Sequence, residues 1–147
     1  NPKNIPNNLM PIIVQVAEGE REALCIYGNE YDTRDGSGER DYIHVSDLAK
    51  GHLLALHKCE SIGGFHVFNL GTGRGTTVRE LVANFEESNG IKIRTIEANK
   101  RPGDVACSVA DVALSEKVLG FSCEYDTRDA CRHSWNWTKR TKYNLLK

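Results

Sequence analysis

The sequence lacks the features that mark several large classes of protein. No apolar run approaches the roughly 20 residues needed to cross a bilayer, which predicts no membrane-spanning segment. Basic residues number 19 and acidic residues 20, so no basic excess points to nucleic acid. Five cysteines are present without a C-x-x-C pair, which favours neither a metal site nor a disulfide framework. Reduced cysteines of this kind predict a cytoplasmic protein.

The start of the chain also lacks expected features. It opens Asn-Pro-Lys-Asn, without an initiator methionine or the apolar stretch of a signal peptide. We therefore expect the sequence to be a fragment of a longer protein. Its 147 residues, 39% hydrophobic and 27% charged, fit one globular domain spanning residues 1–147.

Helical and strand patterns alternate along the chain, which predicts a mixed α/β fold. The clearest helix start is the capping box of Thr77 and Glu80, and Gly90 is typical of the helix end. The remaining helices are expected from Asn7 or Asn8 to about Gly19, from Ser46 or Asp47 to about Lys58, from Asp111 to Gly120, and from Thr127 onward. Strands are expected at residues 24–27, 41–45, 65–70 and 91–97, with a long polar loop over residues 28–40.

Two expectations about packing accompany this assignment. In the helix over residues 46–58, Leu48, Ala49, Leu53 and Leu56 should face inward. The leucines are nevertheless too many for one buried stripe, so an apolar surface is expected to remain exposed in the isolated chain. Trp135 and Trp137, in the last helix, are expected to be packing residues.

A glycine-rich turn follows the strand predicted at residues 65–70. The sequence Gly-Thr-Gly-Arg-Gly at residues 71–75, followed by a helix, is close to the dinucleotide-binding pattern. The sixth position of that pattern requires glycine for close helix–strand packing, and Thr76 stands there. The backbone N–H groups of the turn could still receive an anion. We favour a plain strand-to-helix turn without NAD.

Three stretches together resemble one enzyme family. They are Pro-Asn-Asn-Leu-Met at residues 6–10, Gly-Asn-x-Tyr-x-Thr-x-Asp-Gly leading into Arg-Asp-Tyr-Ile-His-Val at residues 28–45, and Arg-Pro-Gly-Asp at residues 101–104. In this order and spacing they are similar to the UDP-glucose (UDP-galactose) 4-epimerases of the extended short-chain dehydrogenase superfamily. The resemblance implies the C-terminal, substrate-binding domain of such an enzyme, without the Rossmann half that binds NAD.

The resemblance also implies roles for individual residues. Arg40 and Arg101 would bind the diphosphate of a UDP-sugar, whose oxygens match the planar fork of a guanidinium. Asp104 would accept hydrogen bonds from the ribose hydroxyls, and Asn8 would lie near the phosphates, although a turn cap and a plain helix cap are the respective alternatives. The backbone of Cys25, Ile26 and Tyr27 would read the uracil.

Ser108 lies four residues after Asp104, where the resembling family has a residue that faces the sugar. A large aromatic residue there would admit only the plain hexose, whereas a small one would also admit an N-acetyl group at carbon two. Serine therefore predicts that UDP-GlcNAc and UDP-GalNAc are accepted. The alternative is an ordinary strand residue, or an alignment shifted onto Cys107.

The family chemistry is removal and return of a hydride at carbon four of the sugar by NAD. The NAD site and the catalytic residues would lie in the other half, so no catalytic residue and no cofactor contact is assigned here, and the chain alone is expected to be inactive. The longer protein would be a homodimer. Two other readings stay open: a different nucleotide-sugar enzyme of this superfamily, such as a decarboxylase or dehydratase, and a non-catalytic module that binds a nucleotide sugar or a partner subunit.

Overall fold

A computed structural model describes residues 8–145 of the chain, with side chains for residues 8–141. The helices of this part are α1 (Leu9–Ala17), α2 (Val45–Cys59), α3 (Val78–Asn89), α4 (Ala113–Leu119) and α5 (Thr127–Leu145). The strands are β1 (Leu24–Tyr27), β2 (Glu39–Arg40), β3 (Thr76–Thr77), β4 (Thr95–Ala98) and β5 (Cys107–Ser108). The mixed α/β class is confirmed. None of the described helices is long and apolar enough to span a membrane.

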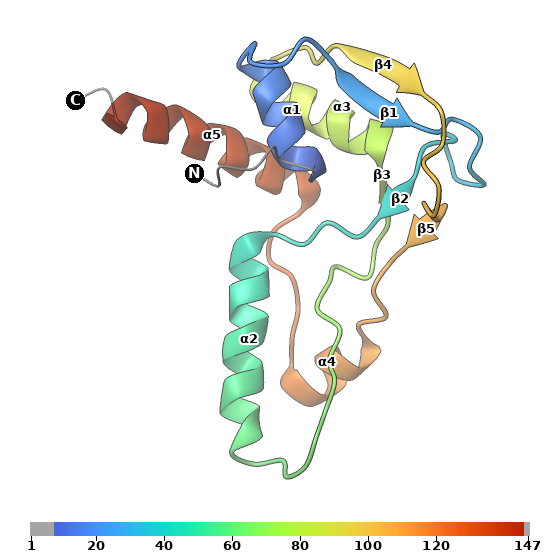
Figure 1. Cartoon of the computed structure of the whole chain (residues 1–147). Coiled ribbons are helices and arrows are strands. Elements are labelled where there is room, and N and C mark those ends of the chain that lie inside the picture. The colour runs from blue at the N-terminus through green and yellow to red at the C-terminus, as the bar shows by residue number, and fades with distance from the viewer. Residues whose placement is uncertain (1–7, 146–147) are drawn as a thin grey trace.

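The strands form two small sheets. β1 and β4 are parallel, with Leu24 opposite Thr95 and Tyr27 opposite Ala98. In the second sheet β2 lies between β3, which is antiparallel, and β5, which is parallel. Parallel neighbours cannot be joined by a tight turn, so the long connections that carry the helices run between them (Figure 1).

The hydrophobic core lies between α1, α3 and α5 beneath the sheet of β1 and β4 (Figure 1). Its central side chains are fully buried: Ile13, Leu81, Phe85 and Cys131. The Trp135 ring meets the Phe85 ring edge to face at 6.1 Å, which confirms Trp135 as a packing residue. Trp137 is 72% exposed, so the same expectation was wrong for it. Burial of these apolar side chains is the main contribution that holds the three helices together.

The helix α2 is attached to the rest of the described structure by contacts that include Asp47 and Gly51. The carboxylate of Asp47 accepts hydrogen bonds from the backbone N–H groups of Glu124 and Tyr125, both at 3.1 Å. At Gly51 the helix comes so close to Leu70 that an added Cβ would lie 2.6 Å from the Leu70 side chain. Elsewhere α2 and α4 extend away from the core, as the lower half of Figure 1 shows.

The start of α3 is as predicted. The Thr77 hydroxyl accepts a hydrogen bond from the Glu80 N–H, and the Glu80 carboxylate accepts one from the Thr77 N–H. Gly90 ends the helix with φ +66°, a left-handed conformation that glycine adopts without strain. By contrast, α2 is capped by His44, whose Nδ1 accepts from the Ser46 N–H, and not by Ser46 or Asp47.

Two predicted strands are absent from the described residues. Residues 65–70 are extended without strand pairing, and Phe65 is 90% exposed. A strand requires a neighbour to bond with, and no described strand pairs with this segment. Residues 41–44 follow the short strand β2 and lead directly into α2. The strand predicted at residues 91–97 is limited to Thr95–Ala98.

The inward face predicted for α2 was also wrong in part. Leu53 is 56% exposed and Leu56 65% exposed, because nothing in the described structure covers that side of the helix. Ala49 is exposed as well, while Leu48 is half-buried. The expected exposure of apolar surface is thereby confirmed for α2.

Candidate functional site

The segment after β4 brings three of the predicted site residues into contact. The backbone N–H of Asp104 donates to the Arg101 carbonyl at 3.2 Å, which closes the turn that contains Pro102 and Gly103. The Arg101 Nε donates to Asp104 Oδ2 at 3.0 Å. Its guanidinium carbon lies 4.2 Å from the centroid of the Tyr27 ring, at the end of β1. The turn therefore holds a directed arginine beside an aromatic ring and a carboxylate.

The strand β1 has one edge free of other strands. The backbone groups of Leu24 and Gly28 pair with the β4 side. Alternate residues of a strand direct their backbone groups to opposite sides, so the N–H and C=O groups of Cys25 and Tyr27 are directed away from β4. No other described strand occupies that side. The backbone groups of Ile26 are directed toward β4, and its side chain is buried. Cys25 and Tyr27 are therefore the better placed of the three to bind a planar base through the backbone.

Arg40 and Ser108 lie opposite each other in the second sheet. The Arg40 Nη1 donates to the carbonyls of Glu39, at 2.7 Å, and Ala106, at 3.4 Å. Both residues line a polar cavity of about 680 Å³ between β5, residues 68–70 and α2. The structure thus places an arginine and a small side chain at neighbouring positions on the wall of one cavity.

Asn8 stands at the start of α1 and has no hydrogen bond to these groups in the described structure. It precedes α1, its side chain is exposed and makes no cap hydrogen bond, and its carbonyl accepts from Ile12 N–H at 3.4 Å. The expected helix-cap bond is therefore not made, and a phosphate role stays a prediction. The preceding residues 6–7, Pro-Asn, lie outside the described residues.

The glycine turn at residues 71–73 already binds an anion of the protein itself. The backbone N–H groups of Thr72 and Gly73 donate to the Asp41 carboxylate at 2.9 and 3.0 Å. An added Cβ at Gly71 would lie 2.5 Å from Asp41 Oδ2, so the approach is too close for any other residue. The turn does not fit the pyrophosphate of NAD, and the role of Asp41 was not visible in the sequence.

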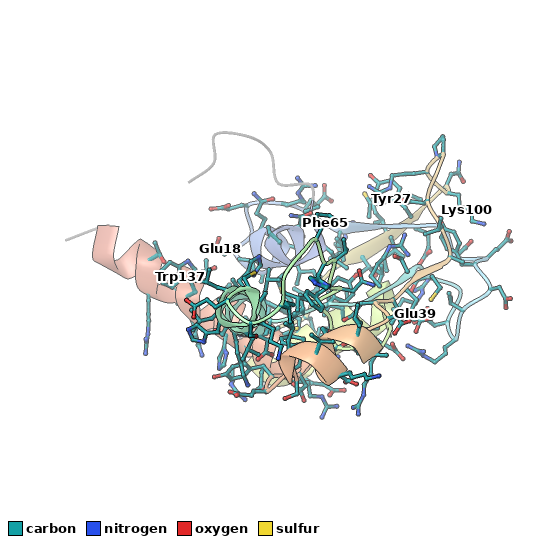
Figure 2. All side chains as sticks on the ribbon, turned by 90° about the horizontal axis from the view of Figure 1, so that it is seen from below. Glu18, Tyr27, Glu39, Phe65, Lys100 and Trp137 are labelled. Carbon is teal, nitrogen blue, oxygen red and sulfur yellow. The ribbon has the colours of Figure 1, made fainter. Side chains whose placement is uncertain are left out.

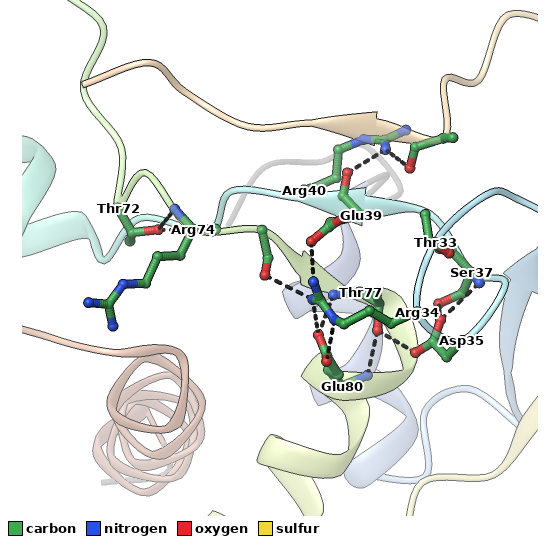
Figure 3. Close-up of polar contacts among 12 residues, drawn as sticks. Thr33, Arg34, Asp35, Ser37, Glu39, Arg40, Thr72, Arg74, Thr77 and Glu80 are labelled. Atoms are coloured by element: carbon green, nitrogen blue, oxygen red, sulfur yellow. Dashed lines mark hydrogen bonds and ion pairs between the residues drawn. The ribbon is translucent and has the colours of Figure 1, made fainter. Parts of the chain in front are cut away.

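The long loop over residues 28–40 is held by a charged network around Arg34 (Figure 3). The Arg34 guanidinium pairs with the Glu80 and Glu39 carboxylates, each at 2.7 Å, and donates to the Gly75 carbonyl. The hydrogen bonds that Arg34 donates to Glu80 and then to Glu39 raise the pKa of its guanidinium, which is half exposed. The Asp35 carboxylate accepts from Ser37 and from the Thr77 hydroxyl. The loop is thereby fixed to the start of α3 and leads into Arg40 in a defined direction.

Metal binding finds no support in the described residues. No group of three or more His, Cys, Asp or Glu side chains there could hold a metal ion. All five cysteines are free thiols. The spacing Tyr-x-x-x-Lys, typical of the catalytic pair in the resembling family, does occur at residues 143 and 147. It lies beyond every segment that carries the resemblance, and residue 147 is outside the described part, so we assign it no role.

Comparison with known proteins gives one consistent result. The sequence profile described as "NAD dependent epimerase/dehydratase family" matches residues 1–71. UDP-glucose 4-epimerase 1 of Oryza sativa subsp. japonica is 49% identical over 146 residues, which are 97% of this chain and 41% of the rice protein. The chain thus spans about two-fifths of the length of the curated relatives that it matches, and it corresponds to their C-terminal part.

Solved structures agree with the sequence relatives. The UDP-glucose-4-epimerase of Stenotrophomonas maltophila, with bound NAD and formylated UDP-arabinopyranose, superposes with a TM-score of 0.94 at 40% identity, over 98% of this chain and 43% of that one. The enzyme of Bifidobacterium longum, in complex with NAD+ and UDP, gives a TM-score of 0.89 at 42% identity, over 97% and 42% of the two chains. The fold expected from the resemblance is confirmed.

Proposed function

We propose that this chain, whose residues 1–71 match the NAD dependent epimerase/dehydratase family, binds the UDP-sugar in a UDP-glucose 4-epimerase. The observation that carries the proposal is the cluster of Tyr27, Arg101 and Asp104 at the end of β1. A uracil could bond to the backbone of β1 there, a ribose to Asp104, and a diphosphate to Arg101. Solved relatives that bind UDP and a UDP-sugar support this assignment.

The second part of the proposed site is the cavity that Arg40 and Ser108 line. A UDP-sugar extended from β1 past Arg101 would bring its diphosphate between two arginines, since the segment that carries Arg101 leads directly into β5. Each guanidinium can form two parallel hydrogen bonds to phosphate oxygens. Ser108, opposite Arg40, would then face the sugar.

In this proposal the chain contributes binding and orientation. NAD, bound by the rest of the protein, supplies hydride transfer at the sugar. Nucleotide contacts far from the reacting carbon lower the barrier by fixing the sugar in position, which converts remote binding energy into rate. We place the protein in the cytoplasm and expect the longer form to be a homodimer.

A sister enzyme of the superfamily is the main alternative. The Arg-Asp-Tyr-Ile-His-Val and Arg-x-Gly-Asp segments would serve a nucleotide-sugar decarboxylase or dehydratase equally well. The curated relatives are named as UDP-glucose 4-epimerases, which favours that enzyme over a decarboxylase or dehydratase. A module that binds a nucleotide sugar without catalysis would have the same cluster around Arg101.

The direct test is a titration of the 147-residue chain with UDP, followed by NMR chemical shifts. We expect saturable binding, with the largest shifts at β1 and at residues 101–108. Arg40→Ala and Arg101→Ala should each weaken binding by about 1.5–3 kcal/mol, the range for a charged hydrogen bond. Lysine at either position should restore only part of this, because the bidentate fork is lost.

The control is Arg140→Ala, which removes an exposed arginine of α5 that has no ion pair in the described structure. It should leave the affinity for UDP unchanged. If UDP does not bind, or if it binds equally well to both alanine variants of the proposed site, the assignment of the diphosphate site is incorrect.

A further inference from the structure

The carboxylate of Asp41 lies where three segments of the chain meet. Its Oδ1 accepts hydrogen bonds from the Thr72 N–H at 2.9 Å and the Thr72 hydroxyl at 2.6 Å, and its Oδ2 accepts one from the Gly73 N–H at 3.0 Å. The backbone N–H of Asp41 donates to the Ser108 carbonyl at 3.2 Å. One residue thus joins the end of β2, the glycine turn and β5.

The position of Arg40 depends on this junction. β2 contains only Glu39 and Arg40, so few ladder hydrogen bonds hold the strand in place. Immediately after Arg40, the side chain of Asp41 supplies three further hydrogen bonds to residues 72–73. Arg40, Asp41 and the residues that lead into the glycine turn line the same cavity. The spacing between Arg40 and the facing wall is therefore set largely by Asp41.

The negative charge of Asp41 would be unfavourable for diphosphate binding if the carboxylate lay near the diphosphate without hydrogen-bond partners of its own. A carboxylate on the wall of a cavity that receives a diphosphate repels it. Here three donors face the carboxylate oxygens, and hydrogen bonds of this kind spread and stabilise the negative charge. This arrangement fits a clamp, in which the Asp41 carboxylate joins the end of β2 to the glycine turn at residues 71–73.

We infer that Asp41 is a positioning residue for the diphosphate site: it holds the glycine turn at residues 71–73 against the strand end that carries Arg40, so that Arg40 faces the phosphates. The inference rests on the proposed UDP-sugar function. It extends that function to a residue that would not itself touch the nucleotide, and it gives the glycine turn a use other than binding NAD.

The test compares UDP with uridine, which lacks the phosphates, in NMR titrations of the 147-residue chain and its Asp41→Asn variant. One oxygen of asparagine can accept from Thr72, but its NH₂ group then faces the Gly73 N–H, so the clamp loosens. We expect the Kd for UDP to rise roughly tenfold, as for loss of one charged hydrogen bond, and the Kd for uridine to stay within about twofold. The matched control is Asp32→Asn, an exposed carboxylate with no partner in the described structure.

The three possible roles of Asp41 give different results. A nearby charge without a positioning role predicts that Asp41→Asn tightens UDP binding, and a purely structural role predicts equal loss of UDP and uridine; either result overturns the inference. If UDP binds normally to Asp41→Asn, the inference is also wrong while the proposed function stands. If the unsubstituted chain binds neither ligand, the proposed function fails and the inference with it.

A second pair of variants guards against misfolding of Asp41→Asn. Thr72→Ala removes the hydroxyl that donates to Asp41, whereas Thr72→Ser keeps it. We expect weaker UDP binding for alanine and near-normal binding for serine. Adding Thr72→Ala to Asp41→Asn should cost little more, because both changes act on one interaction. A full additive loss would contradict the clamp.

Discussion

At the level of single residues, Ser108 is the position with the clearest consequence for substrate choice. Its side chain is exposed on β5 opposite Arg40 and lines the cavity that we assign to the diphosphate and sugar. A serine fills little of that space, so room is left for a substituent on the sugar. Cys107, the neighbouring residue, is also small, and a shift of one position in the alignment leaves the same expectation.

We therefore predict that an enzyme containing this segment acts on UDP-GlcNAc and UDP-GalNAc as well as on UDP-glucose and UDP-galactose. Ser108→Tyr should abolish turnover of the N-acetylated pair and spare the plain pair, since overfilling a packed pocket costs about 1–3 kcal/mol. The measurement is the ratio of kcat/KM for the two pairs in the parent and the variant. Equal loss on both pairs, or a parent inactive on the N-acetylated pair, would show that Ser108 is not the gate.

Residues differ in how readily the sequence predicts them. The contact between Arg101 and Asp104 was predictable, because a Pro-Gly turn brings positions three apart together, and their hydrogen bond of 3.0 Å agrees. Asp41 and Arg34 were missed. Asp41 binds Thr72, 31 positions away, and Arg34 binds Glu80, 46 positions away. Only the folded chain brings such pairs together, and no local pattern marks them.

Helices and strands likewise differ in whether the local sequence predicts them. The capping box of α3 and the glycine after it depend on residues within one turn of the helix, so the sequence predicted both ends correctly. The segment over residues 65–70 has the alternation of a strand but lacks a partner strand in the described structure. Strand formation depends on a neighbour, which the local sequence does not specify.

The start of α3 also carries acid-sensitive contacts. Burial acts to raise the pKa of Asp35, but the hydrogen bonds from Thr77 and Ser37 outweigh it and hold that pKa below its usual value. The Arg34 guanidinium, and then the Thr77 N–H, lower the pKa of Glu80 below 4.5. As ionised acceptors, these carboxylates tie the loop over residues 28–40 to the start of α3 (Figure 3).

A carboxyl group whose pKa is lower in the folded state stabilises that state above its unfolded pKa, and the stabilisation is lost as the pH falls through the folded value. We therefore predict that the melting temperature falls as the pH is lowered from about 5 to 3, the range around unperturbed carboxyl pKa values. Asp35→Asn should be less stable near neutral pH and should show a shallower dependence below pH 5. Asp32→Asn, the exposed control, should keep the parent's slope; if Asp35→Asn also keeps it, the assignment is wrong.

At the scale of the whole molecule, the main apolar core is confined to one part of the structure. Its buried cluster comes from α1, β1, α3, α5 and the residues before β4, whereas α2 contributes only Asp47 and Gly51 to the buried set. Tyr27 and Lys100 mark one end of the molecule and Trp137 the other (Figure 2). The side of α2 that carries Leu53 and Leu56, together with the extended segment over residues 65–70, is left without cover.

An uncovered apolar surface next to an unpaired extended segment favours association. We predict that the isolated chain binds a hydrophobic dye and self-associates, measured by dye fluorescence and by light scattering after gel filtration. The double variant Leu53→Gln/Leu56→Gln should reduce both signals without lowering the melting temperature, because these side chains contribute little to the core. Trp137→Gln removes an equally exposed but isolated apolar group on α5 and should change neither signal. A chain that stays monomeric, binds no dye and unfolds in one sharp transition would mean that this surface is covered in solution by a rearrangement of α2.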